Sequence, residues 1–269
     1  MIAFVLGGGG LLGASEVGML QALAEAAVVP DLVVGSSVGA INGAAVAGDP
    51  SPGTTDRLAD MWAELGSRDV FGSGFLGQLR NLARTRVSLH DNDALRSLIT
   101  AYTGDARIED LTVPFQCVAA SIEQAGAHWF SEGPLVEAVL ASCAVPGLLP
   151  PVSIGDEHFV DGGLVHSIPV GRAVQLGATE IFVLHVGRIE RPLTAPRWPW
   201  EVGLVSFEIA RRHRFTEEMA GLPSHLKVHV LPTGDDATPL ANLRYRDARG
   251  VRPRIATARA ATAAYLAGA

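Results

Sequence analysis

The 269-residue chain has only two cysteines, a single lysine and no excess of positive charge. Cys117 and Cys143 lie too far apart for a CxxC pair, and two cysteines make no disulfide framework, which favours a reducing, cytoplasmic environment. The formal net charge of -7 argues against a nucleic-acid partner, because phosphates require a basic protein surface.

Long hydrophobic runs are also missing. The N-terminal segment MIAFVLGGGG has no basic n-region, and its apolar run of about five residues is shorter than the roughly 7–15 residues of a secretory signal. No uninterrupted apolar stretch approaches the roughly 18–20 residues of a membrane span. Any membrane contact is therefore expected to be peripheral.

The residues that are present are typical of a globular α/β protein. Hydrophobic residues make up 48% of the chain and charged residues 18%. No Ser-, Pro- and Gly-rich linker separates two halves, so we expect one domain over residues 1–269. Strands are predicted at 2–6 and 31–35, and helices at 16–27 and 38–47. This alternation predicts a parallel sheet with right-handed crossovers.

The order of elements remains α/β further along the chain. Residues 91–93 predict a helix start, whereas residues 67–87 are interrupted by glycines and are expected to be irregular with one short helix. The other helices are expected near 55–65, 135–142, 170–176 and 252–266. The other strands are expected at 115–122, 128–130, 159–160, 180–186 and 227–231.

A Gly-x-Ser-x-Gly pentapeptide lies between a predicted strand and a predicted helix. Gly35 and Gly39 allow a tight turn that exposes the Ser37 hydroxyl at its tip. The following helix directs its positive end toward this serine. Ser37 is therefore the predicted nucleophile, and the alternative is a tight turn with an incidental serine.

A run of four glycines follows the first predicted strand and precedes a helix. The backbone N–H groups of Gly8, Gly9 and Gly10 can bind an anion, either a phosphate or the oxyanion of a tetrahedral intermediate. With Gly13 the spacing also fits a dinucleotide fingerprint, but the acidic residue that this motif needs at the end of the next strand is missing. An oxyanion loop is therefore favoured, with a purely structural loop as the alternative.

A candidate base follows another predicted strand. Asp161 is followed by Gly162 and Gly163, and Asp-Gly by itself is a common turn signal. Asp161 becomes the candidate base because a serine nucleophile needs a base to accept its proton.

Together, the three motifs resemble those of patatin-like phospholipases. They occur in the family's order, and ASCAVPGLLPPV at residues 141–152 is similar to the family's Ala-Ser-x-Ala-x-Pro…Pro-Pro-Val signature. The resemblance is strongest over residues 2–186; over 187–269 we expect a helical part with one further strand. It implies a three-layer α/β sandwich with a mostly parallel central sheet flanked by helices.

The resemblance also implies a mechanism and a substrate class. Ser37 and Asp161 would form a dyad that hydrolyses lipid acyl esters through an acyl-enzyme, with Gly8, Gly9 and Gly10 as the oxyanion hole. Because a carboxylate of ordinary pKa, about 4, is a poor base for serine, we expect partial desolvation to raise the pKa of Asp161. No cofactor is implied, and no metal-binding motif such as HExxH is present.

Two positions depart from the family's pattern. Leu12 replaces an arginine inside the glycine loop, which leaves a preference for anionic headgroups unsupported. His166-Ser167 replaces an asparagine after the Asp-Gly-Gly. His166 is also the histidine to test for a Ser-acid-His triad, although α/β-hydrolases place several strands before the nucleophile and here one strand precedes that of Ser37.

Alternatives remain for the function and for one segment. An acyltransferase would use the same Ser37 with an acceptor other than water, and an inert regulatory module would keep only the fold. Residues 191–215 combine Trp198 and Trp200 with apolar residues and arginines. They predict either a lid or docking helix at a membrane surface or an amphipathic helix packed on its own sheet.

Overall fold

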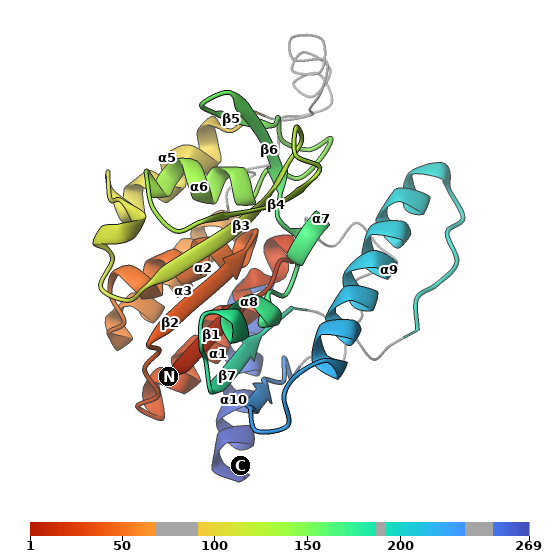
Figure 1. The fold of residues 1–269 in the computed structure, drawn as a ribbon. Helices are drawn as coiled ribbons and strands as arrows, with labels where there is room; N and C mark the ends of the chain where they lie inside the picture. Colours follow the sequence, from red (N-terminus) through yellow and green to blue (C-terminus); the bar gives the residue numbers. More distant parts are fainter. Residues whose placement is uncertain (68–90, 187–191, 235–249, 269) are drawn as a thin grey trace.

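The computed structural model describes residues 1–67, 91–186, 192–234 and 250–268 (Figure 1). Nearly all of the predicted irregular stretch 67–87 lies outside these ranges. Within them, no helix is both long and apolar enough to cross a membrane.

Apolar runs form the centre of the sheet. β1 (Ile2–Leu6), β2 (Leu32–Ser36) and β7 (Glu180–Leu184) pair in parallel and are buried along almost their whole length. Strands covered by helices on both faces need continuous rather than alternating apolar sequence, which these strands have. β3 (Phe115–Ser121) and β8 (Lys227–Val230) extend the parallel part beside β2 and β7.

An antiparallel part joins the sheet at β3. β4 (Gly126–Phe130) pairs with one edge of β3, which confirms the hairpin predicted for 128–130. β6 (Glu157–Asp161) pairs with the other edge, and the unpredicted short strand β5 (Val152–Ile154) adds to β6. The strand order is β5-β6-β3-β2-β1-β7-β8, with β4 beside β3.

The register on β3 brings two distant parts of the chain together. β2 ends at Ser36 opposite Val118, and β6 ends at Asp161 opposite Ala119, the next position along β3. β2 is parallel and β6 antiparallel to β3, so the two strands approach each other head-on along the same edge. The residue that follows β2, Ser37, therefore lies at the end of β6.

Helices cover both faces of the sheet, so the fold is the expected three-layer α/β sandwich (Figure 1). The helices of the larger core are α1 (Ala14–Glu25), α2 (Val38–Gly48), α3 (Pro52–Ser67), α5 (Asp93–Thr103), α6 (Leu135–Ser142) and α10 (Val251–Gly268). The other face carries α8 (Val170–Gln175) and α9 (Pro199–Ala220), and the short α7 (Gly163–His166) lies beside α9. The helix predicted at 135–142 is thus confirmed with its bounds, and those predicted at 38–47 and 252–266 are confirmed with small shifts at their ends.

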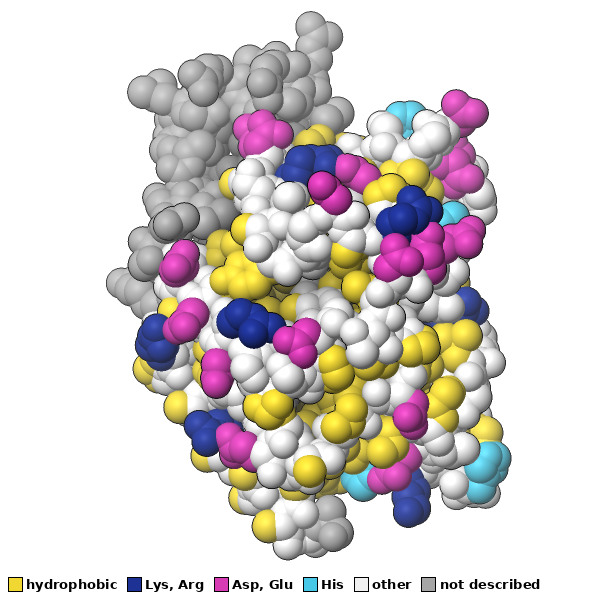
Figure 2. Space-filling model, turned by 90° about the vertical axis from the view of Figure 1, so that its left-hand side faces the viewer, with side chains coloured by type: hydrophobic (Ala, Val, Ile, Leu, Met, Phe, Trp, Pro, Cys, Tyr) yellow, Lys and Arg dark blue, Asp and Glu magenta, His cyan; other side chains and the backbone are white. Residues whose placement is uncertain are grey.

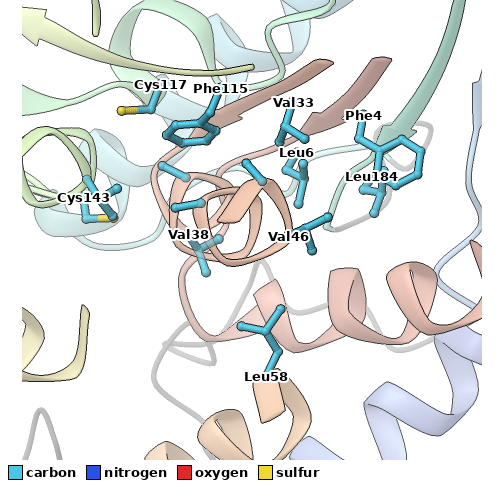
Figure 3. Packing of buried hydrophobic residues seen from close by; sticks show 14 of the residues in the cluster. Phe4, Leu6, Val33, Val38, Val46, Leu58, Phe115, Cys117, Cys143 and Leu184 are labelled. Carbon is cyan, nitrogen blue, oxygen red and sulfur yellow. The ribbon is translucent and has the colours of Figure 1, made fainter. Parts of the chain in front are cut away.

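Helix α2 packs closely on the sheet because its residues are small. Leu6, Val33 and Phe115 lie on the sheet face that α2 covers (Figure 3). A Cβ added at Gly43 of α2 would lie 3.0 Å from Val33 Cγ1 and 3.2 Å from a ring carbon of Phe115. This close packing fixes the N-terminal end of α2, where Ser37 lies, relative to the strands.

Candidate active site

Ser37 occupies a tight turn between β2 and α2. Its backbone angles, φ 53° and ψ -126°, place a non-glycine residue in the left-handed half of φ space, at a cost on the order of 1–3 kcal/mol. The flanking glycines let the turn close. A Cβ at Gly35 would lie 2.6 Å from the Gly39 carbonyl oxygen, and one at Gly39 would lie 2.4 Å from the Leu6 carbonyl oxygen. The strand–turn–helix arrangement that the pentapeptide predicts is therefore present.

Asp161 lies beside Ser37 at the end of β6. The Ser37 hydroxyl donates a hydrogen bond of 2.6 Å to Asp161 Oδ2, and the Gly163 N–H donates one of 2.7 Å to Oδ1. Both partners are buried, with relative exposures of 6% for Ser37 and 4% for Asp161. Gly162 is required next to them, because a Cβ there would lie 2.1 Å from the Val118 carbonyl oxygen. Two of the three predicted motifs thus meet in one buried contact.

The burial changes the acidity of Asp161. Desolvation raises the pKa of its carboxyl from 3.8 to about 6, while the Ser37 hydroxyl and the Gly163 N–H offset part of this rise. A carboxylate with this pKa is ionised at neutral pH and accepts a proton more readily than an exposed aspartate. The raised pKa expected of a base for serine is therefore present.

The glycine loop packs against Ser37, but one of its three expected N–H donors is hydrogen-bonded to a carbonyl of the protein. A Cβ at Gly8 would lie 3.3 Å from Ser37 Cβ. The Gly8 N–H donates a hydrogen bond of 2.8 Å to the Ser167 carbonyl oxygen. In this conformation the Gly8 N–H is therefore bound to the protein itself, and its role as an oxyanion donor stays a prediction. A loop held this close to a neighbouring segment needs some of its N–H groups to satisfy buried carbonyls.

Gly9 and Gly10 carry the remaining candidate donors of this loop. Neither N–H has a protein acceptor among the residues that the structure describes. A Cβ at Gly9 would lie 1.7 Å from Val186 Cγ2, and Gly10 has a φ of 57°, so both positions require glycine. The 3-10 helix η1 (Gly10–Gly13) then leads from the loop into α1.

A buried polar network under the loop was not predicted. Asn42 of α2 donates through Nδ2 to Glu16 Oε2 at 2.8 Å and to the Gly13 carbonyl oxygen at 3.1 Å. Trp62 Nε1 donates to Asn42 Oδ1 at 2.9 Å. Burial raises the pKa of Glu16 well above 4.5. The network ties the end of the glycine loop to α1, α2 and α3, and a single acidic residue at the start of an apolar helix was its only sequence signal.

His166 is directed toward α9 and does not complete a triad with Ser37 and Asp161. Its Nδ1 lies 2.9 Å from Glu218 Oε1, and its ring packs on Trp129 with centroids 5.3 Å apart. Glu218 also accepts the Gly171 N–H through Oε2, so the His166–Glu218 contact joins α9 to α7 and α8.

The two cysteines, Cys117 and Cys143, are free and buried. Burial raises the pKa of both thiols, so both remain protonated at neutral pH. Because the thiolate is the reactive form, neither cysteine competes with Ser37 as a nucleophile.

Helix α9 packs against α7 and α8 of the same chain, and a membrane-surface role for this segment stays a prediction. Phe215 joins the smaller core, and Glu208 pairs with Arg211 in a buried ion pair. The helix also reaches the site: the Phe207 ring would lie 3.0 Å from a Cβ at Gly163, next to Asp161. Part of the cover over the Ser37–Asp161 pair is therefore supplied by α9.

Other features of the described residues lie away from the Ser37–Asp161 pair. A cavity of about 340 Å³ lies at the C-terminal end of α2, lined by residues that include Gly48, Leu58 and Leu135 and not by Ser37 or Asp161. In the described ranges, no three His, Cys, Asp or Glu side chains gather as metal ligands. On the face seen in Figure 2, basic side chains lie among acidic ones rather than in a continuous basic patch.

The family model described as Patatin-like phospholipase matches residues 4–174. The chain is 34% identical over 196 residues to patatin-like phospholipase domain-containing protein 7 of Mus musculus, covering 72% of this chain and 14% of that protein. It is 32% identical over 193 residues to lysophospholipase nte1 of Aspergillus terreus, covering 70% of this chain and 12% of that protein. The chain thus spans only a small part of these relatives.

A solved structure shares the fold. VipD from Legionella pneumophila matches with a TM-score of 0.50 at 14% sequence identity, covering 99% of this chain and 66% of that chain. The family model covers more than half of the sequence, including all three motifs. The chain belongs to the patatin-like phospholipase family.

Proposed function

We propose that this chain is a serine acyl-ester hydrolase acting on lipids, of the phospholipase A, lysophospholipase or esterase type. The observation that carries the proposal is the buried 2.6 Å hydrogen bond from the Ser37 hydroxyl to Asp161 Oδ2, formed by a serine with a positive φ. The names of the relatives, which include phospholipase and lysophospholipase, support lipid esters as the substrate class.

In the first half-reaction, Ser37 Oγ attacks the ester carbonyl carbon while its proton passes to Asp161 Oδ2. The carbonyl oxygen becomes an oxyanion, and the N–H groups of Gly9 and Gly10 are the proposed donors that stabilise it. When the intermediate collapses, the bond to the leaving alcohol breaks and Asp161 returns the proton to the alcohol oxygen. The acyl group remains on Ser37 as an ester.

In the second half-reaction, water takes the place of the alcohol. Asp161 accepts a proton from water as the water oxygen attacks the acyl-enzyme carbonyl carbon. Collapse of this intermediate releases the fatty acid, and the proton on Asp161 returns to Ser37 Oγ. The same two side chains therefore serve both steps, and no cofactor enters the scheme.

Covalent labelling tests the nucleophile directly. A fluorophosphonate probe is expected to label the wild-type chain and not Ser37→Ala, because the probe reacts only with an activated serine. Hydrolysis of p-nitrophenyl esters of rising chain length and of phospholipids then defines the substrate class. A wild-type chain that is neither labelled nor active on any ester would identify an inert module and end the proposal.

We further propose a reducing, cytoplasmic location with peripheral contact to lipid surfaces. The free thiols of Cys117 and Cys143 fit the location. Trp198, at the N-cap of α9, and Val202 and Ile209 within the helix are more than half exposed, and this helix borders the site through Phe207. Exposed aromatic and aliphatic side chains on a helix that borders the site suit an enzyme that takes its substrate from a lipid surface.

Vesicle sedimentation with a matched pair of valines tests this contact. Val202 on α9 is 51% exposed. Val29, which precedes β2 and so lies toward the other end of this strand from Ser37, is 54% exposed. Val202→Ser is expected to weaken binding to phosphatidylcholine vesicles about fivefold, because about 1 kcal/mol of apolar burial is lost. Val29→Ser is expected to leave binding unchanged. Equal binding by the two variants would contradict contact through α9.

A further inference from the structure

Ser142 connects the two halves of the site through its side chain. It is the last residue of α6 and is fully buried. Its hydroxyl oxygen accepts the backbone N–H of Ser37 at 2.8 Å, across 105 positions of sequence. The backbone of the candidate nucleophile is therefore held by a side chain that belongs to another helix.

The backbone at the end of α6 holds the candidate base as well. The Ser142 carbonyl oxygen accepts the Gly162 N–H at 3.1 Å, and the Ala144 carbonyl oxygen accepts the Asp161 N–H at 2.9 Å. The Ser142 carbonyl is free to accept this bond because the last carbonyls of a helix lack partners within the helix, and Ala144 lies just beyond the end of α6. One short segment thus contacts the backbone on both sides of the Ser37–Asp161 hydrogen bond.

The Ser37 N–H depends on this acceptor. Ser37 lies just beyond the last residue of β2, and among the described residues the Ser142 hydroxyl is the acceptor of its N–H. At 6% exposure, water has little access to it. A buried N–H without an acceptor is unfavourable, and the turn would be expected to shift if the Ser142 oxygen were removed.

We propose that Ser142 is a positioning residue, which holds Ser37 Oγ at hydrogen-bonding distance from Asp161 Oδ2 by accepting the Ser37 N–H while its own carbonyl holds Gly162. This inference rests on the proposed function of Ser37 and Asp161. It also assigns the Ser37 N–H to the scaffold, so this group is not a donor to the oxyanion. Ser142 touches neither the substrate nor the reacting atoms.

Two substitutions of Ser142 and one matched control test the proposal. Ser142→Ala removes the acceptor, and Ser142→Cys keeps the approximate volume while replacing oxygen by the weaker acceptor sulfur. The control is Ser36→Ala: Ser36 is also fully buried, is adjacent to Ser37, and its hydroxyl has no hydrogen-bond partner among the described residues. Both sites therefore lose a buried hydroxyl oxygen, but only at Ser142 is a hydrogen bond lost.

The kinetic constants on a soluble p-nitrophenyl ester separate positioning from simple stability. Ser142→Ala is expected to lower kcat about 10- to 100-fold with KM within twofold, and Ser142→Cys to fall between it and the wild type. Ser36→Ala is expected to stay within twofold of the wild type. Each rate is measured well below the melting temperature of that variant, so a loss of folded protein does not enter.

The dependence of kcat/KM on pH gives a second measurement, because a purely structural role of Ser142 would not shift its acid limb. The hydrogen bond from Ser37 lowers the pKa of Asp161. If the Ser142 substitutions displace Ser37, this bond weakens and the acid limb of kcat/KM moves to higher pH. Ser36→Ala is expected to leave the limb in place.

The outcomes separate this inference from the proposed function. Three results together would overturn the positioning role. The wild type is active, kcat of both Ser142 variants lies within twofold of that of Ser36→Ala, and the acid limb of their kcat/KM profiles does not move. If Ser142→Ala does not fold, Ser142→Cys alone decides by the same criteria. A wild-type chain without turnover or labelling would instead defeat the proposed function itself.

Discussion

Two unfavourable features meet at the Ser37–Asp161 pair. Ser37 has a positive φ, and Asp161 is a buried carboxylate whose described polar contacts are neutral, the Ser37 hydroxyl and the Gly163 N–H. Each feature lowers the stability of the folded chain, yet each suits an activated serine, because the strained turn directs the hydroxyl toward Asp161 and burial strengthens the base. A stability measurement at this pair therefore reports on the proposed chemistry.

Asp161→Asn is expected to stabilise the fold at neutral pH. The pKa of Asp161 is about 6 in the folded chain against an ordinary 3.8, so folding favours its protonated form. That contribution is complete below about pH 4 and is lost as the pH rises through 6. The stability of Asp161→Asn relative to the wild type should increase between pH 4 and 7 and then level off, with a total change of about 2–3 kcal/mol.

Urea unfolding of both proteins at unit steps from pH 4 to 8 measures this difference. The other titrating groups, including Glu16, contribute equally to both proteins and cancel. A difference that does not vary with pH would mean that Asp161 is not desolvated as described.

Gly9→Ala is expected to reduce kcat about 100-fold or more with little change in KM. The added Cβ would lie 1.7 Å from Val186 Cγ2, so the loop must move and the proposed oxyanion donors move with it. Val186→Ala removes the clashing methyl group, and the double variant should recover part of the lost kcat. Steady-state kinetics on a soluble ester measure both effects. A double variant with the same kcat as Gly9→Ala would show that the clash with Val186 does not cause the loss.

At the residue scale, the sequence indicates those parts of the site that depend on local geometry. Ser37 and Gly9 were predicted because their roles follow from neighbouring residues, a strand before and a helix after. The Gly8 bond to Ser167 and the Ser142 bond to Ser37 depend on how segments far apart in sequence are placed. No local pattern specifies such contacts, so the sequence alone does not predict them.

At the scale of elements, α1 and α10 pack closely against each other. Gly18 lies where the two helices meet, and a Cβ there would lie 2.2 Å from the Ile255 carbonyl oxygen and 2.8 Å from the Arg259 nitrogen. Backbone atoms cannot move aside as side chains do. The glycine therefore determines how near the C-terminal helix approaches the rest of the fold.

Gly18→Ala is expected to lower the free energy of unfolding by about 2–4 kcal/mol, because the helices must separate. The matched control is Gly203→Ala in α9, where no described residue, apart from its chain neighbours and the backbone of its own helix, lies within 4 Å of the added Cβ. This control should be stabilised by about 0.5–1 kcal/mol, since alanine is the better helix former. Denaturant unfolding measures both changes. Equal effects of the two substitutions would contradict the close contact of α1 with α10.

Elements with a strong apolar period were predicted, whereas the short elements β5 and α7 were not. The strands 2–6 and 180–186 and the helix 252–266 carry their own signal in sequence. β5 and α7 are only three and four residues long, and they form because β6 and α9 provide partners. Their existence follows from tertiary contacts, which a single sequence does not reveal.

At the scale of the whole molecule, the sheet is what assembles the site. The parallel order of β1, β2 and β7 could be predicted from alternating strands and helices. The antiparallel approach of β6 along the β3 edge could not, and it is this approach that brings Asp161 to Ser37. The motifs therefore indicated which residues meet, and the topology explains how they meet.

The dependence of kcat/KM on pH tests the Ser37–Asp161 pair most directly. For the wild type on a soluble p-nitrophenyl ester, kcat/KM should rise with pH through about 6, the pKa of Asp161, and level off by about pH 8. Asp161→Asn should retain at most about 1% of this value at every pH. A flat wild-type profile between pH 5 and 8, or full turnover by Asp161→Asn, would contradict Asp161 as the base.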